Sequence, residues 1–472
     1  MARKWEDIPI NTKLYENIDE GSLTRTLAGL ENAFVNEAGS HTRFPGIDPW
    51  IELPDKGRVY LFGFRGSLMA GTSNGQLYEV DRNGNADRVS EVPVAGNGRM
   101  IFTDTADELI AAAGGAMVRY NGEKTELLSR DGPHTFFPGY IDTYVVAPER
   151  DSARFNHSEA GLSRDWPALN VYTAASKPDF ITAMIITPYK EIIVAGPEST
   201  EQFERLTSGT APFFNRWAIP EGIRAPYTMV FADNAVYMVN NLHEFVRISG
   251  QSSEPKSADI GRVLKNVDDW TDAWSGGYPD KPLNILGQNF IVLQMPHAAT
   301  PYGTKGLTFA YDYKNAKWFS LYGWDEVNGV PTRWPVWSHW PIWDGTYVGG
   351  DNGKIGKIST TGHSNWGTVQ RMVGRTAHLR NMGEIRVDNV RMTFKRGSGS
   401  NVADSLISLQ CSRDDRNTSR WVRKNTGKAG DREATIEFGG FGTGHSFQFN
   451  WEITDDAPME IMNLQAQITK LG

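Results

Sequence analysis

The chain has 472 residues, of which 39% are hydrophobic, 22% charged and 11% aromatic, and its formal net charge is −8. This length allows two or three domains, or one large repeat domain with an appendage. Frequent glycine and aromatic residues favour an all-β protein, because aromatic side chains suit pleated surfaces and glycine suits turns, while the acidic balance argues against a dedicated nucleic-acid binder.

The start of the chain, "MARKWEDIPINTKLYENIDEG", has no apolar core and does not fit a signal peptide. No window approaches the roughly 20 apolar residues needed to cross a bilayer. We therefore expect synthesis in a cytoplasm and no membrane insertion. Residues 1–45 are polar and aperiodic, and they predict an N-terminal arm.

Residues 46–365 predict a β-propeller of six to eight blades. An apolar strand, a turn and a second strand with an aromatic or apolar residue recur, mostly at about 40-residue intervals, which is the period of a four-stranded blade. An interruption, "LKNVDDWTDAWSGGYPDKP", predicts a long loop or a few helical turns. The recurring residues are Tyr78, Tyr120, Phe155, Phe203, Phe245, Tyr311 and Ile355.

Residues 78–89, "YEVDRNGNADRV", carry oxygen-bearing side chains at alternate positions from Asp81 to Asp87, as a calcium loop does. An EF-type loop also needs glycine at its sixth position and glutamate at its twelfth, where this chain has Ala86 and Val92. Asn83-Gly84 instead favours a type I′ hairpin turn. We expect a turn at this place and no calcium site.

Other candidate sites in the propeller region are weak. The "GTSNG" around Ser73 matches a nucleophile elbow, but a strand and not a helix follows it. The histidines are dispersed, no phosphate-binding loop is present, and the single cysteine, Cys411, allows neither a disulfide nor a cysteine-based zinc site. The sequence thus predicts no catalytic, cofactor-binding or metal-binding residues, and no cofactor.

The run "RWPVWSHWPIWDG" places a tryptophan at every third position, and its prolines argue against a helix. These rings could form a platform for sugars, or they could brace a blade entrance or a subunit contact. We favour the second interpretation. The candidate aromatic interface comprises Trp334, Trp337, Trp340 and Trp343.

Residues 366–472 lack the repeat and alternate as strands do, which predicts a C-terminal β-sandwich. "SRDDRNTSRW" partly matches the Asp-box of sialidase-type propellers, but arginine replaces its glycine and its tryptophan, Trp421, comes two positions late. The region is also locally basic, so it could contact phosphates or an acidic partner, or simply be a solvated face. This candidate assembly or DNA-facing patch comprises Arg371, Arg375, Arg380, Arg386, Arg391, Lys395 and Arg396.

Several passages, in this order, resemble a known family: "TRFPGIDPW", "VAGNGRMIFTDTADELIAAAGG", "ITPYKEIIVAGPESTEQFERLTSG", "ADIGRVLKN", "GLTFAYDYKNAKWFSL" and the final "MNLQAQITKLG". The family is that of the tail hub, or nozzle, proteins of short-tailed bacteriophages, of the packaged-DNA-stabilisation type. The resemblance implies a non-enzymatic virion tail protein, assembled as a ring, with six subunits expected. Its partners would be the portal and adaptor, a plug or needle protein, tail spikes or fibres, and the double-stranded DNA that passes through.

Two alternatives from other classes stay open at this point. A propeller glycosidase or depolymerase needs only two suitably placed carboxylates, and a carbohydrate-binding adhesin could use the tryptophan run. Mild acidity fits the hub interpretation, because a channel wall that held every phosphate would stall DNA ejection.

Overall fold

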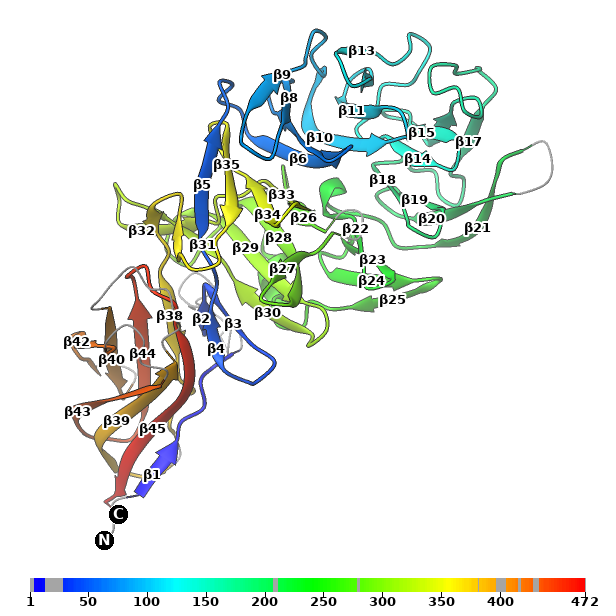
Figure 1. The fold of residues 1–472 in the computed structure, drawn as a ribbon. Coiled ribbons are helices and arrows are strands. Elements are labelled where there is room, and N and C mark those ends of the chain that lie inside the picture. The colour runs from blue at the N-terminus through cyan, green and yellow to red at the C-terminus, as the bar shows by residue number, and fades with distance from the viewer. Residues whose placement is uncertain are drawn as a thin grey trace.

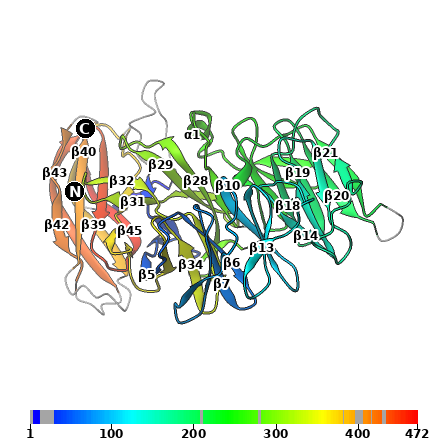
Figure 2. The same cartoon turned by 90° about the horizontal axis from the view of Figure 1, so that it is seen from above.

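The computed structural model describes residues 4–12, 29–206, 211–277, 281–380, 382–395, 405–414, 417–427 and 433–471. Nearly all of its regular structure is strand. The strands form a propeller and a two-sheet sandwich, which lies beside the propeller in both views (Figures 1 and 2). The predicted all-β architecture, with a propeller followed by a C-terminal sandwich, is confirmed.

Within the described residues the propeller has seven blades, and blades 1 to 5 are four-stranded antiparallel meanders. Blade 1 consists of β6 (Val59–Phe64), β7 (Ser67–Thr72), β8 (Leu77–Val80) and β9 (Ala86–Arg88). Blade 2 consists of β10 (Gly96–Asp104), β11 (Leu109–Gly114), β12 (Val118–Tyr120) and β13 (Thr125–Leu127). Blade 3 consists of β14 (Gly139–Ile141), β15 (Tyr144–Pro148), β16 (Arg154–His157) and β17 (Val171–Thr173).

The next two blades follow the same plan. Blade 4 consists of β18 (Ala183–Ile186), β19 (Glu191–Ala195), β20 (Thr200–Arg205) and β21 (Phe213–Ile219). Blade 5 consists of β22 (Val230–Ala232), β23 (Ala235–Val239), β24 (Phe245–Ser249) and β25 (Ser252–Pro255). A short 3-10 helix, η2 (Pro226–Thr228), precedes blade 5, and the helix α1 (Gly261–Lys265) follows it.

Blades 6 and 7 recruit segments that are distant in the chain. Blade 6 consists of β26 (Trp274–Gly276), β27 (Leu283–Ile285), β28 (Gln288–Ala299), β29 (Lys305–Asp312) and β30 (Lys317–Ser320). A hairpin of β31 (Tyr322–Asp325) and β32 (Val330–Arg333) leads to blade 7, which consists of β33 (Ser338–Ile342), β34 (Gly345–Gly349), β35 (Lys354–Ile358) and β5 (Ile47–Glu52).

The pairing of β5 with β35 closes the ring. β5 comes from the start of the propeller sequence, and Ile51 lies opposite Ile355 in antiparallel register. Figure 1 shows the two strands side by side, next to blade 1. The short β36 (Ser364–Asn365) and β37 (Thr368–Val369) extend the same sheet toward the sandwich. Because the first strand completes the last blade, the ring cannot open without breaking this ladder.

The repeat read from the sequence corresponds to one position in every blade. The seven aligned residues all lie in the third strand of successive blades, and each is buried. The interruption before Tyr311 is not entirely loop or helix, because Trp274–Gly276 within it forms β26. This short stretch has the pairing partner that a strand needs, since β26 hydrogen-bonds to β28.

The segment after Tyr78 is a hairpin loop between β8 and β9, as expected, but the turn type differs. Gly84 has a φ of +86°, whereas Asn83 is not among the residues with positive φ. A type I′ turn needs positive φ at both central positions. The loop is instead ordered by the Asp81 carboxylate, whose Oδ1 accepts hydrogen bonds from the backbone N–H of Asn83 (2.8 Å) and of Asn85 (2.9 Å).

The sandwich has two sheets. The first contains β3 (Ala33–Val35), β4 (His41–Arg43), β45 (Glu460–Lys470), β39 (Ile385–Lys395), β43 (Ala434–Gly444) and β1 (Lys4–Asp7). The second contains β38 (Met372–Arg375), β44 (Phe447–Ile453), β40 (Leu406–Arg413), β41 (Asn417–Thr418) and β42 (Val422–Asn425). The described part of segment 1–45 is thus strand-forming, and differs from the free arm that its polar, aperiodic sequence suggested.

A two-residue strand, β2 (Leu30–Glu31), joins the propeller to the sandwich. On one side Glu31 pairs in parallel with Ser320 of β30, and on the other Leu30 lies opposite Gly374 of β38. The sheet of blade 6 therefore continues into the second sheet of the sandwich as one 11-stranded sheet.

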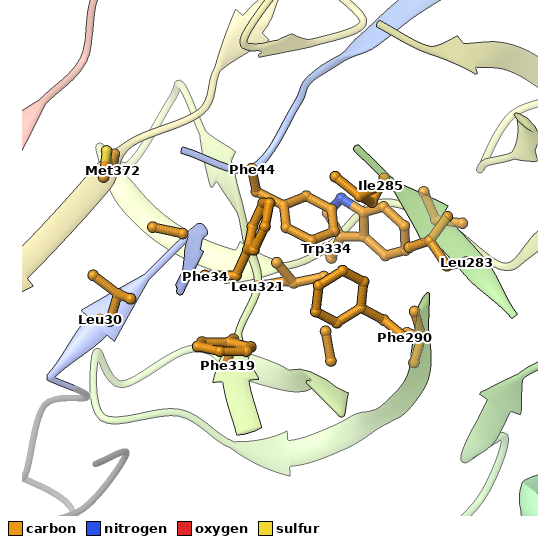
Figure 3. Packing of buried hydrophobic residues seen from close by; sticks show 14 of the residues in the cluster. Leu30, Phe34, Phe44, Leu283, Ile285, Phe290, Phe319, Leu321, Trp334 and Met372 are labelled. Carbon is orange, nitrogen blue, oxygen red and sulfur yellow. The ribbon is translucent and has the colours of Figure 1, made fainter. Parts of the chain in front are cut away.

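An aromatic core lies where β3, blade 6 and the approach to blade 7 meet (Figure 3). Phe34 and Phe44 each pack edge-on against Phe290, with ring centroids 5.4 and 6.0 Å apart. Phe44 also contacts Trp334, with centroids 6.4 Å apart, and Trp334 is fully buried. Residues from the N-terminal segment are therefore part of the propeller core.

Replacing Trp334 with alanine is expected to lower the free energy of unfolding by about 3–5 kcal/mol, because it empties a large buried site. The matched control is Trp421→Ala, since Trp421 is 39% exposed and its loss is expected to change stability by less than about 0.5 kcal/mol. Denaturant unfolding followed by circular dichroism measures both. Equal losses in the two variants would contradict the packing described here.

Candidate functional site

The six described residues of the predicted basic patch are distributed over both sheets of the sandwich and the segment between β38 and β39. Arg371 and Arg375 lie at β38 in one sheet, while β39 in the opposite sheet carries Arg386, Arg391 and Lys395. The exposed Arg380 lies between the two strands, and Arg396 lies outside the described residues. The structure does not gather these side chains into one surface.

Arg371 and Arg375 belong to an interior network centred on Glu31. The Glu31 side chain is 2% exposed, and its carboxylate lies 3.5 Å from Arg371 and 3.4 Å from Arg375. Tyr302 donates its hydroxyl to the same carboxylate (2.5 Å), and burial together with the Glu31 charge raises the pKa of Tyr302. These two arginines compensate a buried charge at the domain junction, so the prediction that they form an exposed patch is wrong.

The remaining basic residues on β39 are exposed and each has an acidic neighbour. Arg386 contacts Asp388 (2.7 Å), Arg391 contacts Glu437 (2.9 Å) and Lys395 contacts Glu460 (3.4 Å). Ion pairs of this kind contribute little to stability. They do reduce the local positive charge, and a DNA-facing or assembly role for Arg380, Arg386, Arg391 and Lys395 stays a prediction.

The tryptophan run does not form a surface platform. Trp334 and Trp337 are 0% and 2% exposed, so neither can serve a subunit interface, and this part of the prediction is wrong. Trp340 packs on Phe62 of blade 1, with ring centroids 4.5 Å apart. Trp343 donates its indole N–H to the carbonyl of Gly66 (2.8 Å). Of the four tryptophans, only Trp340 lies within β33, and Trp340 and Trp343 brace blade 7 against blade 1.

Trp337 is held by charged groups where blades 6, 7 and 1 meet. Its indole N–H donates to Asp351 (2.7 Å), which is also paired with Arg333. The guanidinium groups of Arg58 and Arg333 lie 4.1 and 4.4 Å from the ring centroid. Arg58 is paired in turn with Asp272 (2.6 Å). Cation–π contacts of this kind contribute about 0.5–2 kcal/mol each, so the arrangement strengthens the seam at which the ring closes.

The motifs that resembled catalytic or structural signatures have local roles. Ser73 lies in the turn between β7 and β8, and its hydroxyl accepts the backbone N–H of Arg58 (3.0 Å). In the Asp-box-like segment, Asp414 accepts the backbone N–H groups of His445 (2.7 Å) and Ser446 (3.0 Å). In the described part of the chain, no group of three or more His, Cys, Asp or Glu is arranged to hold a metal ion.

Buried polar groups at the domain junction were not singled out from the sequence. The guanidinium of Arg43 is fully enclosed and donates to backbone carbonyls, among them those of Ala457 (2.9 Å) and Gln370. Burial lowers the pKa of Arg43 to about 10. The only available signal was an arginine flanked by strand residues in "HTRF", which does not distinguish a buried arginine from an exposed one.

Three histidines are held neutral by burial. Desolvation lowers the pKa of His41 and of His339 to about 4, and burial together with the Arg43 charge lowers that of His363 to about 3. Neither ring nitrogen of His41 or His339 has a hydrogen-bond partner among the described residues. Protonation of any of these histidines therefore destabilises the folded chain.

The fold is a closed propeller joined to a two-sheet sandwich, with several arginines paired to carboxylates at the seams between blades. Residues 29–247, slightly under half of the chain, match the profile of a phage stabilisation family described as "Bacteriophage P22 Gp10, beta-propeller". The match begins at β2 and ends within β24, so it includes the bridging strand, blades 1 to 4 and part of blade 5. Over these residues the chain is similar to this phage family.

Solved structures with a similar arrangement are distant. A streptogramin B lyase shares 10% identity at a TM-score of 0.41, covering 66% of this chain and 97% of that one. Virginiamycin B lyase from Staphylococcus aureus shares 10% identity at a TM-score of 0.38, and the match covers 65% of this chain and 97% of that one. BamB from Moraxella catarrhalis shares 11% identity at a TM-score of 0.40, and the match covers 69% of this chain and 95% of that one. These likenesses carry no argument about function. A search of curated proteins gives no match.

No helix among the described residues is long and apolar enough to cross a membrane.

Charge reversal at Arg375 is expected to destabilise the fold by about 3–5 kcal/mol, because it sets a second negative charge beside the buried Glu31. The matched control is Lys395→Glu, whose side chain is 47% exposed and whose reversal is expected to cost no more than about 1 kcal/mol. Urea unfolding of both variants tests the assignment. A fully stable Arg375→Glu variant would show that Arg375 is not needed at the junction.

Stability is expected to fall on acidification below about pH 6.5. The folded-state pKa of each buried histidine is lowered, so the unfolded chain binds more protons as the pH drops, and stability is lost toward pH 4. Between pH 7.5 and 5.0 each histidine contributes a loss of about 2 kcal/mol. Urea unfolding at the two pH values should show a smaller pH dependence for His363→Gln, and an unchanged one for His134→Gln at an exposed position.

Proposed function

We propose that the protein is the tail hub, or nozzle, of a short-tailed bacteriophage. In this role it assembles as a ring, with six subunits, beneath the portal and adaptor. It extends the DNA channel, helps retain packaged DNA together with a plug or needle protein, and provides docking surfaces for spikes or fibres. The observation that carries the proposal is the match of residues 29–247 to the phage propeller family.

The construction of the chain supports a mechanical role. The ring of blades is closed by a strand from its own beginning, and one continuous sheet ties the propeller to the sandwich. A sheet that is continuous between the two parts transmits load between the neighbours that the subunit contacts. Rings form when two different patches of the same subunit meet and the rotation closes, and a propeller with an attached sandwich presents such distinct patches.

The charge of the chain is compatible with a channel component. The net charge is −8, and Arg386, Arg391 and Lys395 of the sandwich each have an acidic neighbour. Double-stranded DNA moves freely only past a wall that does not bind each phosphate. We therefore propose that packaged DNA is retained because the channel is closed, and not because the DNA binds to the channel wall.

We propose that the chain has no enzymatic activity. Glycoside hydrolysis requires a pair of carboxyl groups, and among the described residues that line the central cavity of the propeller none is Asp or Glu. The nearby Asp272 and Asp351 are each paired with an arginine. The tryptophans that a carbohydrate-binding adhesin would use are in part buried, which removes the observation that favoured that alternative.

Mass photometry of the purified chain, alone and with a portal–adaptor complex, tests the proposal. We expect either a closed ring or monomers that are recruited in a fixed multiple, six, onto the complex. Electron microscopy of the same sample should then place the subunits below the adaptor. A monomer that ignores the complex would overturn the hub assignment.

The exposed basic residues can be tested in the same assay. Reversing both Arg380 and Lys395 to glutamate is expected to reduce recruitment several-fold without lowering stability, if these residues meet an acidic partner surface. The matched control reverses Lys124 and Arg154, which are exposed on blades 2 and 3. Unchanged recruitment of the first double variant would remove these two residues from the assembly surface.

A further inference from the structure

A cavity of about 90 Å³ lies on the axis of the propeller, and every blade, or the segment leading into it, contributes to its wall. The wall of this cavity has an apolar side and a side that carries polar groups. Blades 3 and 4 supply apolar groups such as Phe137 and Met184, whereas the other blades supply Arg99, Tyr60, Ser275 and His339. A polar space of this size accommodates several water molecules or a small ion.

Arg99 is the cation of this cavity, and it has no carboxylate partner within ion-pair distance among the described residues. Its guanidinium lies 4.8 Å from the ring of Tyr60 and 4.6 Å from that of Trp274, and it donates to the carbonyl of Trp337. Burial lowers its pKa to about 10, although the side chain keeps some accessible surface. Both observations fit a cation that is largely desolvated and faces a partly open cavity.

Two further polar side chains in the wall are buried without partners. His339 and Ser275 are each 7% exposed, and neither the ring nitrogens of His339 nor the hydroxyl of Ser275 has a hydrogen-bond partner in the described part of the chain. Unpaired buried polar groups are costly. Gly276 maintains the space beside them, since any side chain there would collide with Nε2 of His339.

The hydrogen-bonding groups that face the cavity can all act as donors. Burial raises the pKa of Tyr60, and that of Tyr227 to about 12, so both hydroxyls remain protonated at neutral pH. The backbone N–H of Arg99 already donates to the Tyr227 oxygen (3.2 Å), which leaves the hydroxyl proton of Tyr227 free to point elsewhere. Neutral His339 offers one N–H, and Ser275 one O–H.

We propose that the axial cavity binds a small oxyanion, of the size of phosphate or a short carboxylate, which pairs with Arg99. The remaining oxygens of the anion accept hydrogen bonds from Ser275, His339 and the two tyrosines. Charge-assisted hydrogen bonds of this kind are roughly twice as strong as neutral ones. A bound anion contacts several blades at once, so it stabilises the closed ring. The inference is independent of the proposed assembly role.

Isothermal titration of the full-length chain in a chloride buffer, with inorganic phosphate and separately with acetate, tests the site. We expect saturable binding of at least one of them, with one site per chain, and a matching rise in the unfolding temperature. Binding of phosphate alone would assign a tetrahedral oxyanion, and binding of acetate a carboxylate. Absence of saturable binding of both anions up to 100-fold above physiological phosphate, roughly 0.1–1 M, would overturn the proposal.

Two variants and a control locate the site. Arg99→Met is expected to weaken binding at least tenfold, through loss of the charge-assisted contact. Ser275→Ala removes a single hydroxyl without a large change in volume and is expected to weaken it about fivefold, which keeps the test decisive if Arg99→Met fails to fold. Ser90→Ala, at a buried serine outside the cavity, should bind as the wild type does. Equal affinity in Ser275→Ala and Ser90→Ala would overturn the assignment.

Discussion

The architecture depends on the buried charge of Glu31. A carboxylate removed from water is tolerated only when it is paired and hydrogen-bonded, and here Arg371, Arg375 and Tyr302 surround it. These partners come from two stretches of the chain distant from Glu31, the segment at β38 and the loop that holds Tyr302. The backbone of Glu31 meanwhile pairs with the outer strand of blade 6 and with β38 of the sandwich. The same residue therefore supplies the hydrogen bonds that continue the sheet and the charge that selects its neighbours.

The residues just after Glu31 link the junction to the rest of the propeller ring. Phe34 and Phe44 enter the core beside blade 6 (Figure 3), Arg43 binds carbonyls of the sandwich, and β5 closes blade 7. The propeller and the sandwich thus share one N-terminal segment, and neither is complete without it. Because this segment must be in place before the last blade can close, ring closure and docking of the two parts are coupled.

The repeat could be recognised in the sequence because every blade needs a buried aromatic or apolar residue at the same position. A buried aromatic or apolar residue in the third strand packs between adjacent blades, so Tyr78 and its six counterparts mark the period even though the blade sequences differ. The N-terminal segment had no such marker. Its strands are two to four residues long, and each is specified by distant partners. A run as polar as "HTRF" reads as loop unless the sandwich that buries it is known.

The candidate sites also depend on contacts between residues that are distant in the sequence, and the sequence did not reveal these contacts. Spacing correctly suggested that the tryptophans brace blades, but it could not say which rings are inside, because that depends on the neighbouring blade. The basic residues between 371 and 396 looked like a single patch because charge was summed along the chain. In three dimensions β38 and β39 belong to opposite sheets, and acidic residues distant in sequence, such as Glu31 and Glu437, are their partners.

The pairing of charges also constrains how the chain can recognise other molecules. Most of the strong cations among the described residues at the seams, including Arg58, Arg333 and Arg371, already have carboxylate partners within the chain. A partner that binds these particular cations through charge would have to break the existing pairs. Arg99 differs because its side chain faces the partly open cavity on the propeller axis. At the seams, therefore, the paired cations stabilise the fold, whereas the charge of Arg99 is left for a molecule that enters the cavity.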